Sequence, residues 1–152
     1  MTRTLADVSP ELGQRVDSLD TPVVVVDLDV MERNIRDFMA FAETHDVGVR
    51  SHTKAHKIPD IARRQEEPPG SGVLCQKLSE AEVMARHGVT DILLVCPVVT
   101  PRKLERLLWL SRKVGDFSTV VDCPGNAEPL QRAAERRDET VDVVMEVDVG
   151  LN

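Results

Sequence analysis

A chain of 152 residues can form one ordinary domain with a buried core, and it leaves no room for a second domain of that size. The formal charge of −7, without a stripe of clustered Lys and Arg, argues against a nucleic-acid surface, which must neutralise phosphates. No apolar run reaches the ~18 residues of a membrane span, and residues 1–20 lack the apolar core of a signal peptide. We therefore expect a cytoplasmic protein that binds neither nucleic acid nor membranes.

The first predicted elements are a strand and a helix. The valines at 23–26, between Pro22 and Asp27, predict a buried strand. The apolar period then changes to that of an amphipathic helix over residues 30–44, and Asp29, three residues before Glu32, is placed to cap it. The apolar positions of this helix are Met31, Ile35, Phe38 and Ala42.

Strands and helices alternate through the rest of the chain. Predicted strands cover 47–52, 72–76, 91–98, 117–122 and 141–150, and predicted helices cover 59–65, 79–88, 100–115 and 126–137. Start signals include Pro59, a capping box of Ser79 with Glu82, and the Thr100-Pro101 pair. Such alternation indicates parallel strands covered by helices, and hence an α/β fold.

Two parallel-sheet architectures fit this pattern, an open doubly wound sheet and a (β/α) barrel. Gly70 and Gly72 are not followed by a third glycine at the spacing of a dinucleotide fingerprint, because Cys75 stands there. The sequence therefore favours the barrel. In the last strand, the apolar residues are expected to pack on the helices, whereas Glu146 and Asp148 face the barrel mouth or, alternatively, solvent at an edge. The apolar set is Val141, Val143, Met145, Val147 and Val149.

The three cysteines, Cys75, Cys96 and Cys123, are far apart and show no Cys-x-x-Cys spacing. We expect buried, reduced thiols rather than a disulfide framework.

The segment RSHTKAHKIPD, residues 50–60, carries the candidate chemistry. Lys54 falls just past a predicted strand and so lies on the catalytic face of a barrel. A lysine amine that loses its proton can condense with a carbonyl, and Lys57, His52 and His56 could promote that loss. Two alternatives are a solvated basic turn and a two-histidine metal clip, which Pro59 disfavours because the helix begins after both histidines.

Four blocks of the chain resemble successive blocks of the fold-type III pyridoxal-phosphate enzymes. They are DTPVVVVDLDVMERNI (20–35), HDVGVRSHTKAHKIPDIARRQ (45–65), GVLCQKLSEAEVMARHGVTDILL (72–94) and VDVVMEVDVGLN (141–152). The amino-acid sequences of these blocks are most similar to those of the D-threonine aldolase and D-serine dehydratase group, which is related to the N-terminal domain of alanine racemase. The blocks occur in the same order as in that family.

The resemblance implies that Lys54 holds pyridoxal 5'-phosphate covalently. It also implies that Gln76 and Arg50 contribute to cofactor binding, Gln76 by lining the pocket and Arg50, or alternatively Ser51, by supporting the lysine loop. The implied activity is a lyase that cleaves D-3-hydroxy amino acids, such as D-threonine, to glycine and an aldehyde. A D-serine dehydratase-like enzyme and a non-catalytic barrel fragment that binds the cofactor remain as alternatives. A homodimer is implied for the full-length protein.

The resemblance also implies the domain organisation. Residues 1–20 form an arm, and residues 21–152 form the N-terminal part of a barrel preceded by a strand and a helix. Counting from Val47 gives about five of the eight strands of a (β/α)8 barrel. We expect a truncated chain that is inactive alone and that lacks the residues with which the family binds a divalent metal.

Overall fold

The computed structural model describes residues 13–68 and 70–150. The predicted arm at 1–20 therefore lies outside the described residues over positions 1–12. In chain order the elements are η1 (Val16–Ser18), α1 (Leu28–Thr44), β1 (Val49–His52), η2 (Thr53–Ala55), α2 (Pro59–Glu66), β2 (Ser71–Cys75), α3 (Leu78–Arg86), β3 (Asp91–Leu94), α4 (Pro101–Ser111), β4 (Asp116–Val121), α5 (Pro124–Glu135) and β5 (Asp142–Met145). None of these helices is long and apolar enough to cross a membrane.

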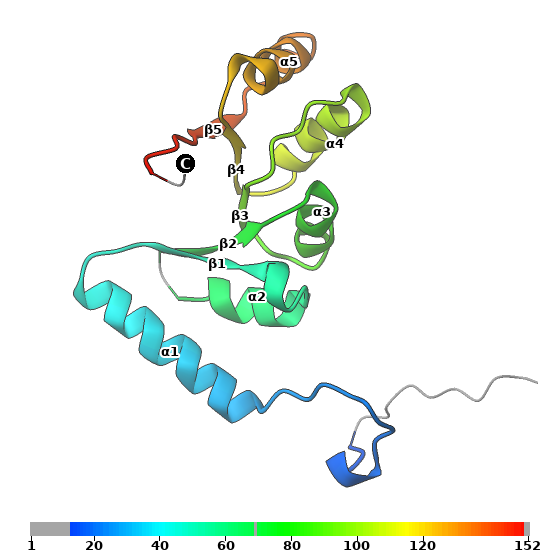
Figure 1. Cartoon of the computed structure of the whole chain (residues 1–152), viewed down its shortest axis with the longest axis vertical. Coiled ribbons are helices and arrows are strands. Elements are labelled where there is room, and N and C mark those ends of the chain that lie inside the picture. Colours follow the sequence, from blue (N-terminus) through cyan, green and yellow to red (C-terminus); the bar gives the residue numbers. More distant parts are fainter. Residues whose placement is uncertain (1–12, 69, 151–152) are drawn as a thin grey trace, which may run out of the picture.

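The five strands form one parallel sheet in the order β1-β2-β3-β4-β5. Helices α2 to α5 follow one another along one side of this curved sheet (Figure 1). A doubly wound sheet would reverse its strand order and carry helices on both faces. The sequential order therefore confirms the predicted α/β class and the barrel architecture, with five of eight strands present.

The core lies between the helices and the sheet face that they cover. Alternate strand residues point into this layer, because successive side chains of a strand face opposite ways. Buried apolar side chains from the strands are Val73, Cys75, Ile92, Leu94, Phe117 and Val121, and those from the helices include Ala62, Ala81, Met84, Leu104, Leu107, Leu108 and Leu130. Each fully buried aliphatic side chain stabilises the fold by about 1.5–3 kcal/mol relative to an exposed one.

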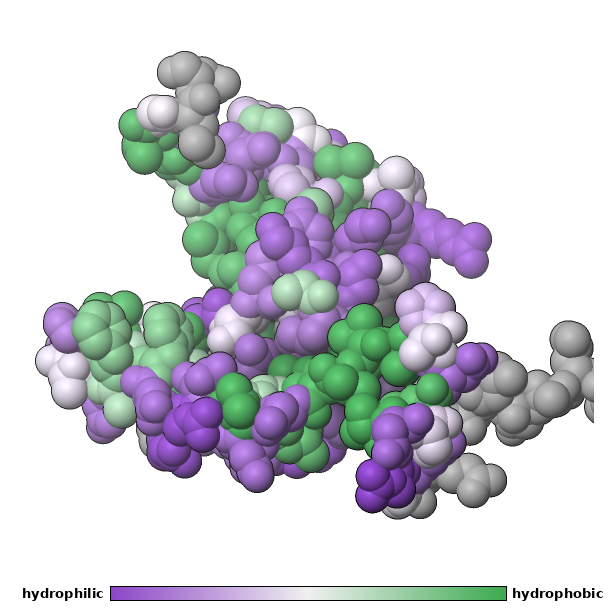
Figure 2. Space-filling model, turned by 60° about the horizontal axis from the view of Figure 1, so that its bottom comes forward, coloured by the Kyte–Doolittle hydropathy of each residue, from purple (hydrophilic) through white to green (hydrophobic). Residues whose placement is uncertain are grey.

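The predicted strand at 23–26 is wrong. These four valines form no strand and are 45–92% exposed. A β-strand needs a neighbouring strand to satisfy its backbone groups, and β1, at the near edge of the sheet, pairs only with β2 within the described residues. Figure 2 shows hydrophobic side chains gathered over the lower part of the molecule, where α1 and the segment before it lie.

Two helix starts also differ from the prediction. α1 is capped by Asp27, whose side chain accepts a hydrogen bond of 3.0 Å from the Val30 amide, so Asp29 lies inside the first turn. α3 begins at Leu78, with Glu80 rather than Glu82 accepting from the amides at its start. Sequence spacing allows more than one acid to cap a helix, and the backbone path decides which one does.

The expected packing of the last strand is also corrected. β5 spans only Asp142–Met145, and all four of its residues are exposed. Val143 and Met145 lie on the helix-side face of the sheet but are 52% and 74% exposed, whereas Val141 packs against the core. Within residues 13–68 and 70–150 no helix follows β5 to cover these side chains.

The cysteines are all free thiols, as predicted, but only Cys75 is fully buried; Cys96 is half-buried and Cys123 is exposed. Burial raises the pKa of the Cys75 thiol to about 11.

Candidate active site

Lys54 lies directly after β1, in η2, at the carboxyl end of the sheet. This placement confirms the position predicted from the sequence. Its side chain is exposed, and within the described part of the chain its ammonium joins no ion pair. In parallel (β/α) folds the carboxyl ends of the strands form the face on which chemistry occurs.

The turn that carries Lys54 is anchored to β2 by the buried side chain of Thr53. Thr53 is fully buried, and its hydroxyl donates to the Leu74 carbonyl oxygen at 3.2 Å. The Thr53 carbonyl oxygen accepts from the amides of His56 and Lys57, at 3.2 and 2.8 Å. The backbone around Lys54 is therefore fixed, whereas its side chain is free to reach a ligand.

The far end of the turn is held by Lys57, which adopts a left-handed φ of 56°. Its ammonium lies 3.7 Å from Oε1 of Glu80, at the start of α3. The other carboxylate oxygen of Glu80 accepts from the amides of Gln76 and Lys77, at 3.0 and 3.3 Å. Glu80 thus ties the lysine turn to the end of β2.

A row of polar side chains crosses the carboxyl ends of β1, β2 and β3. The amide nitrogen of Gln76 donates to the Cys96 sulfur at 2.9 Å, and its amide oxygen lies 3.2 Å from Nε2 of His52. Nδ1 of His52 accepts from the Lys54 amide at 3.3 Å. Gln76 therefore lies one side chain from the lysine turn, and its predicted place in a cofactor pocket stays a prediction.

The sequence predictions did not identify Cys96 and Glu80 as parts of this row. Cys96 follows β3 much as Gln76 follows β2, so both stand where the ends of neighbouring parallel strands meet. Comparing strand-end positions would have grouped these two residues.

Arg50 lies in β1, the strand that precedes the Lys54 turn, toward the amino end of that strand. Its guanidinium donates to the Asp91 carboxylate at 2.9 and 3.2 Å, and it lies 3.8 Å from Asp116. Burial raises the pKa of Asp91 above its ordinary value, even though the hydrogen bonds from Arg50 act in the opposite direction. The predicted role of Arg50 beside the lysine loop stays a prediction, because its partners here stand at the starts of β3 and β4.

The two histidines of the lysine segment have separate partners. His56 accepts from the Ile58 amide at 3.0 Å and lies 3.2 Å from Oε1 of Gln65. His52 contacts Lys54 and Gln76 instead. Among residues 13–68 and 70–150, no three His, Cys, Asp or Glu side chains come together as a metal site would require.

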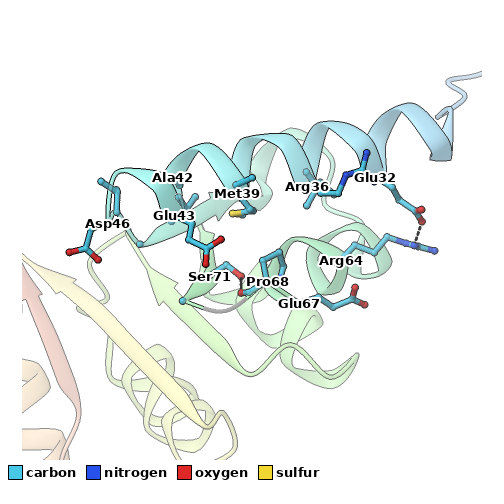
Figure 3. Close-up of a pocket in the computed structure, with 16 residues that line it drawn as sticks. Glu32, Arg36, Met39, Ala42, Glu43, Asp46, Arg64, Glu67, Pro68 and Ser71 are labelled. Atoms are coloured by element: carbon cyan, nitrogen blue, oxygen red, sulfur yellow. Dashed lines mark hydrogen bonds and ion pairs between the residues drawn. The ribbon is translucent and has the colours of Figure 1, made fainter.

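A cavity of about 640 Å³ lies elsewhere, between α1, α2 and the amino ends of β1 and β2. Figure 3 shows Glu32 of α1 and Arg64 of α2 paired at one end of it, with Met39 and Pro68 along its length. Neither Lys54 nor Gln76 lines this cavity. It therefore belongs to the opposite end of the strands from the lysine turn.

Comparison with known proteins identifies the fold that this site belongs to. Residues 26–152 match the family described as alanine racemase, N-terminal domain. The chain belongs to this family. The predicted resemblance to the fold-type III enzymes is confirmed, since the alanine racemase N-terminal domain covers β1 to β5 and the lysine turn.

Three individual relatives illustrate the match. A D-threonine aldolase from Arthrobacter sp is 41% identical over 138 residues, covering 91% of this chain and 36% of the relative. A 3-hydroxy-D-aspartate aldolase from Paracoccus denitrificans is 37% identical over 145 residues, covering 95% and 38%. The crystal structure of D-threonine aldolase from Filomicrobium marinum superposes with a TM-score of 0.84 at 38% identity, covering 90% and 37%. The chain thus spans well under half the length of these relatives.

Proposed function

We propose that this chain carries the cofactor-holding lysine, Lys54, of a pyridoxal-phosphate-dependent lyase that acts on D-3-hydroxy amino acids. The observation that carries the proposal is the fixed turn after β1, which presents the exposed primary amine of Lys54 at the carboxyl end of the sheet, whereas the amine of Lys57 on the same turn is paired with Glu80. A primary amine is the group that the cofactor's aldehyde requires. Gln76, whose side chain hydrogen-bonds to His52 two residues before Lys54, would line the cofactor pocket next to it.

The chemistry would be divided between the cofactor and the protein. When bound, the conjugated ring takes up the electron pair left on the substrate Cα as a bond to it breaks. The described residues supply attachment through Lys54, and a rigid support for it through Thr53 and Glu80. Rigid support keeps the reacting atom within the narrow tolerance that catalysis needs.

The reaction class that we propose is retro-aldol cleavage, in which D-threonine gives glycine and acetaldehyde. Its support is the similarity to two kinds of aldolase, which share a substrate with a hydroxyl on the β-carbon. A D-serine dehydratase-like reaction would instead release a 2-oxo acid and ammonia, and a cofactor-binding fragment would release neither product. Product analysis with D-threonine as the substrate distinguishes the three.

The other expectations from the resemblance stay predictions: a divalent metal in the full-length protein, a homodimer, a cytoplasmic location, the domain boundary at residue 20 and inactivity of this chain alone.

The proposal is tested by titrating the chain with pyridoxal phosphate and following the change in cofactor absorbance. Wild type should bind saturably, and Lys54→Arg should lose the absorbance change because a guanidinium does not condense with the aldehyde. Lys57→Arg is the matched control, since it keeps a cation near Glu80 and leaves Lys54 intact. Equal titrations of wild type and Lys54→Arg would overturn the proposal.

A further inference from the structure

The imidazole of His52 joins the lysine turn to the polar row on the neighbouring strands. It lies between two groups with fixed hydrogen-bonding roles: the Lys54 backbone amide, which can only donate, and Oε1 of Gln76, which can only accept. Nδ1 must therefore be without a proton, and Nε2 must carry one. Both contacts are made together only by the neutral ring protonated at Nε2.

The orientation of the Gln76 side chain matches this ring form. Its amide nitrogen is used by the Cys96 sulfur, at 2.9 Å, and its backbone amide is bound by Glu80, at 3.0 Å. The amide oxygen is then directed at His52. If the Gln76 side chain were reversed, its nitrogen would require an unprotonated Nε2, the ring proton would move to Nδ1, and Nδ1 could no longer accept from Lys54.

We propose that His52 is a positioning residue for Lys54. In its Nε2-protonated form, with Gln76 accepting from Nε2, it holds the Lys54 amide in the lysine turn. The side chain of His52 caps η2, much as Asn or Asp caps a turn, and so fixes the direction in which the lysine leaves the backbone. The part of this proposal that concerns the cofactor rests on the proposed function of Lys54.

Two variants separate the two contacts of the ring. His52→Asn keeps a short side chain whose oxygen can take the place of Nδ1 and accept from the Lys54 amide. His52→Gln is longer, so its terminal amide can take the place of Nε2 toward Gln76 but is poorly placed for the turn. A role in bulk packing would be affected by both changes alike, whereas a positioning role is rescued by asparagine alone.

The first measurement uses the chain without cofactor. Nitrogen NMR shifts of the His52 ring should show a proton on Nε2 and none on Nδ1. The Lys54 amide should exchange with solvent about fivefold faster in His52→Gln than in wild type, as expected for loss of one hydrogen bond, and His52→Asn should stay within about twofold of wild type. A proton on Nδ1, or equal exchange in all three chains, overturns the proposal.

The second measurement adds pyridoxal phosphate and follows the rate at which Lys54 becomes trapped by borohydride. The expected order is wild type and His52→Asn together, with His52→Gln about fivefold slower. Labelling of His52→Gln as fast as wild type overturns the positioning role. If wild type takes no label at Lys54, the proposed function fails instead, and the exchange rates of the cofactor-free chains still decide the role of His52.

Discussion

Replacing Gly72 with alanine would place a methyl group where the Asp91 carboxylate now lies. Gly72 is the partner of Arg50 in the β1–β2 register, and the Arg50 side chain passes over it to reach Asp91 on β3. A Cβ built on Gly72 would stand 2.4 Å from Cγ of Asp91 and 2.6 Å from each of its oxygens. The backbone of Gly72 does not have a positive φ, so the obstacle is space alone.

The cost follows from this geometry. Ordinary contacts of a Cβ begin at 3.4 Å, so Asp91 must move by about 1 Å (3.4 minus 2.4), which breaks its bonds of 2.9 and 3.2 Å with Arg50. Overpacking costs about 1–3 kcal/mol, and loss of a partly exposed ion pair adds at most about 1 kcal/mol. We expect Gly72→Ala to lower the free energy of unfolding by about 2 kcal/mol, and Tm by about 4–8 °C.

The assay is thermal unfolding followed by circular dichroism. Gly115→Ala is the matched control, because its new Cβ meets nothing closer than 3.6 Å and should cost less than about 0.5 kcal/mol. In an Asp91→Ala background the clash is gone, so the cost of Gly72→Ala should fall by about 1.5 kcal/mol. The reasoning is refuted if Gly72→Ala costs no more than Gly115→Ala, or costs the same in both backgrounds.

Two further predictions concern titration. The hydrogen bonds from Arg106 hold the pKa of Glu82 below its ordinary value. The pair therefore stabilises the fold at pH values above the unfolded-state pKa of about 4.3, and this stabilisation is lost as the pH falls through the lower, folded-state pKa. The free energies of unfolding of wild type and Glu82→Gln, measured by urea denaturation, should accordingly converge on acidification by at most about 1 kcal/mol, and a constant difference would contradict the pair's contribution. Burial raises the pKa of Cys75 to about 11, so at neutral pH an alkylating reagent should modify the exposed Cys123 far faster than Cys75, with equal rates only after unfolding; equal rates in the folded chain would be inconsistent with this burial.

Local sequence patterns predicted the elements that pack on one another. The apolar periods around β2, β3 and β4 and the start signal at Pro59 are each satisfied by neighbouring residues, so strand and helix order could be deduced from the sequence. The valines at 23–26 show the limit of such patterns. Their composition suits a strand, but a strand forms only where a second strand can pair with it, and composition does not reveal that partner.

In the candidate site, too, one part could be predicted from local sequence patterns and another part could not. Lys54 could be placed from the sequence because its position depends only on the strand before it. The contacts of His52 with Gln76, and of Gln76 with Cys96, depend on the register between three strands, which no single segment encodes. The same holds for Arg50, whose acidic partners become neighbours only when β3 and β4 are aligned beside β1 and β2.

We propose that Lys54, and no other lysine of the chain, holds pyridoxal phosphate. The most direct measurement is reduction of the cofactor-loaded chain with borohydride, followed by peptide mapping of the label by mass spectrometry. The account predicts a label on Lys54 at close to one per chain, with Lys57 and the remaining lysines at background. A label spread evenly over the lysines, or concentrated on Lys57, would contradict it.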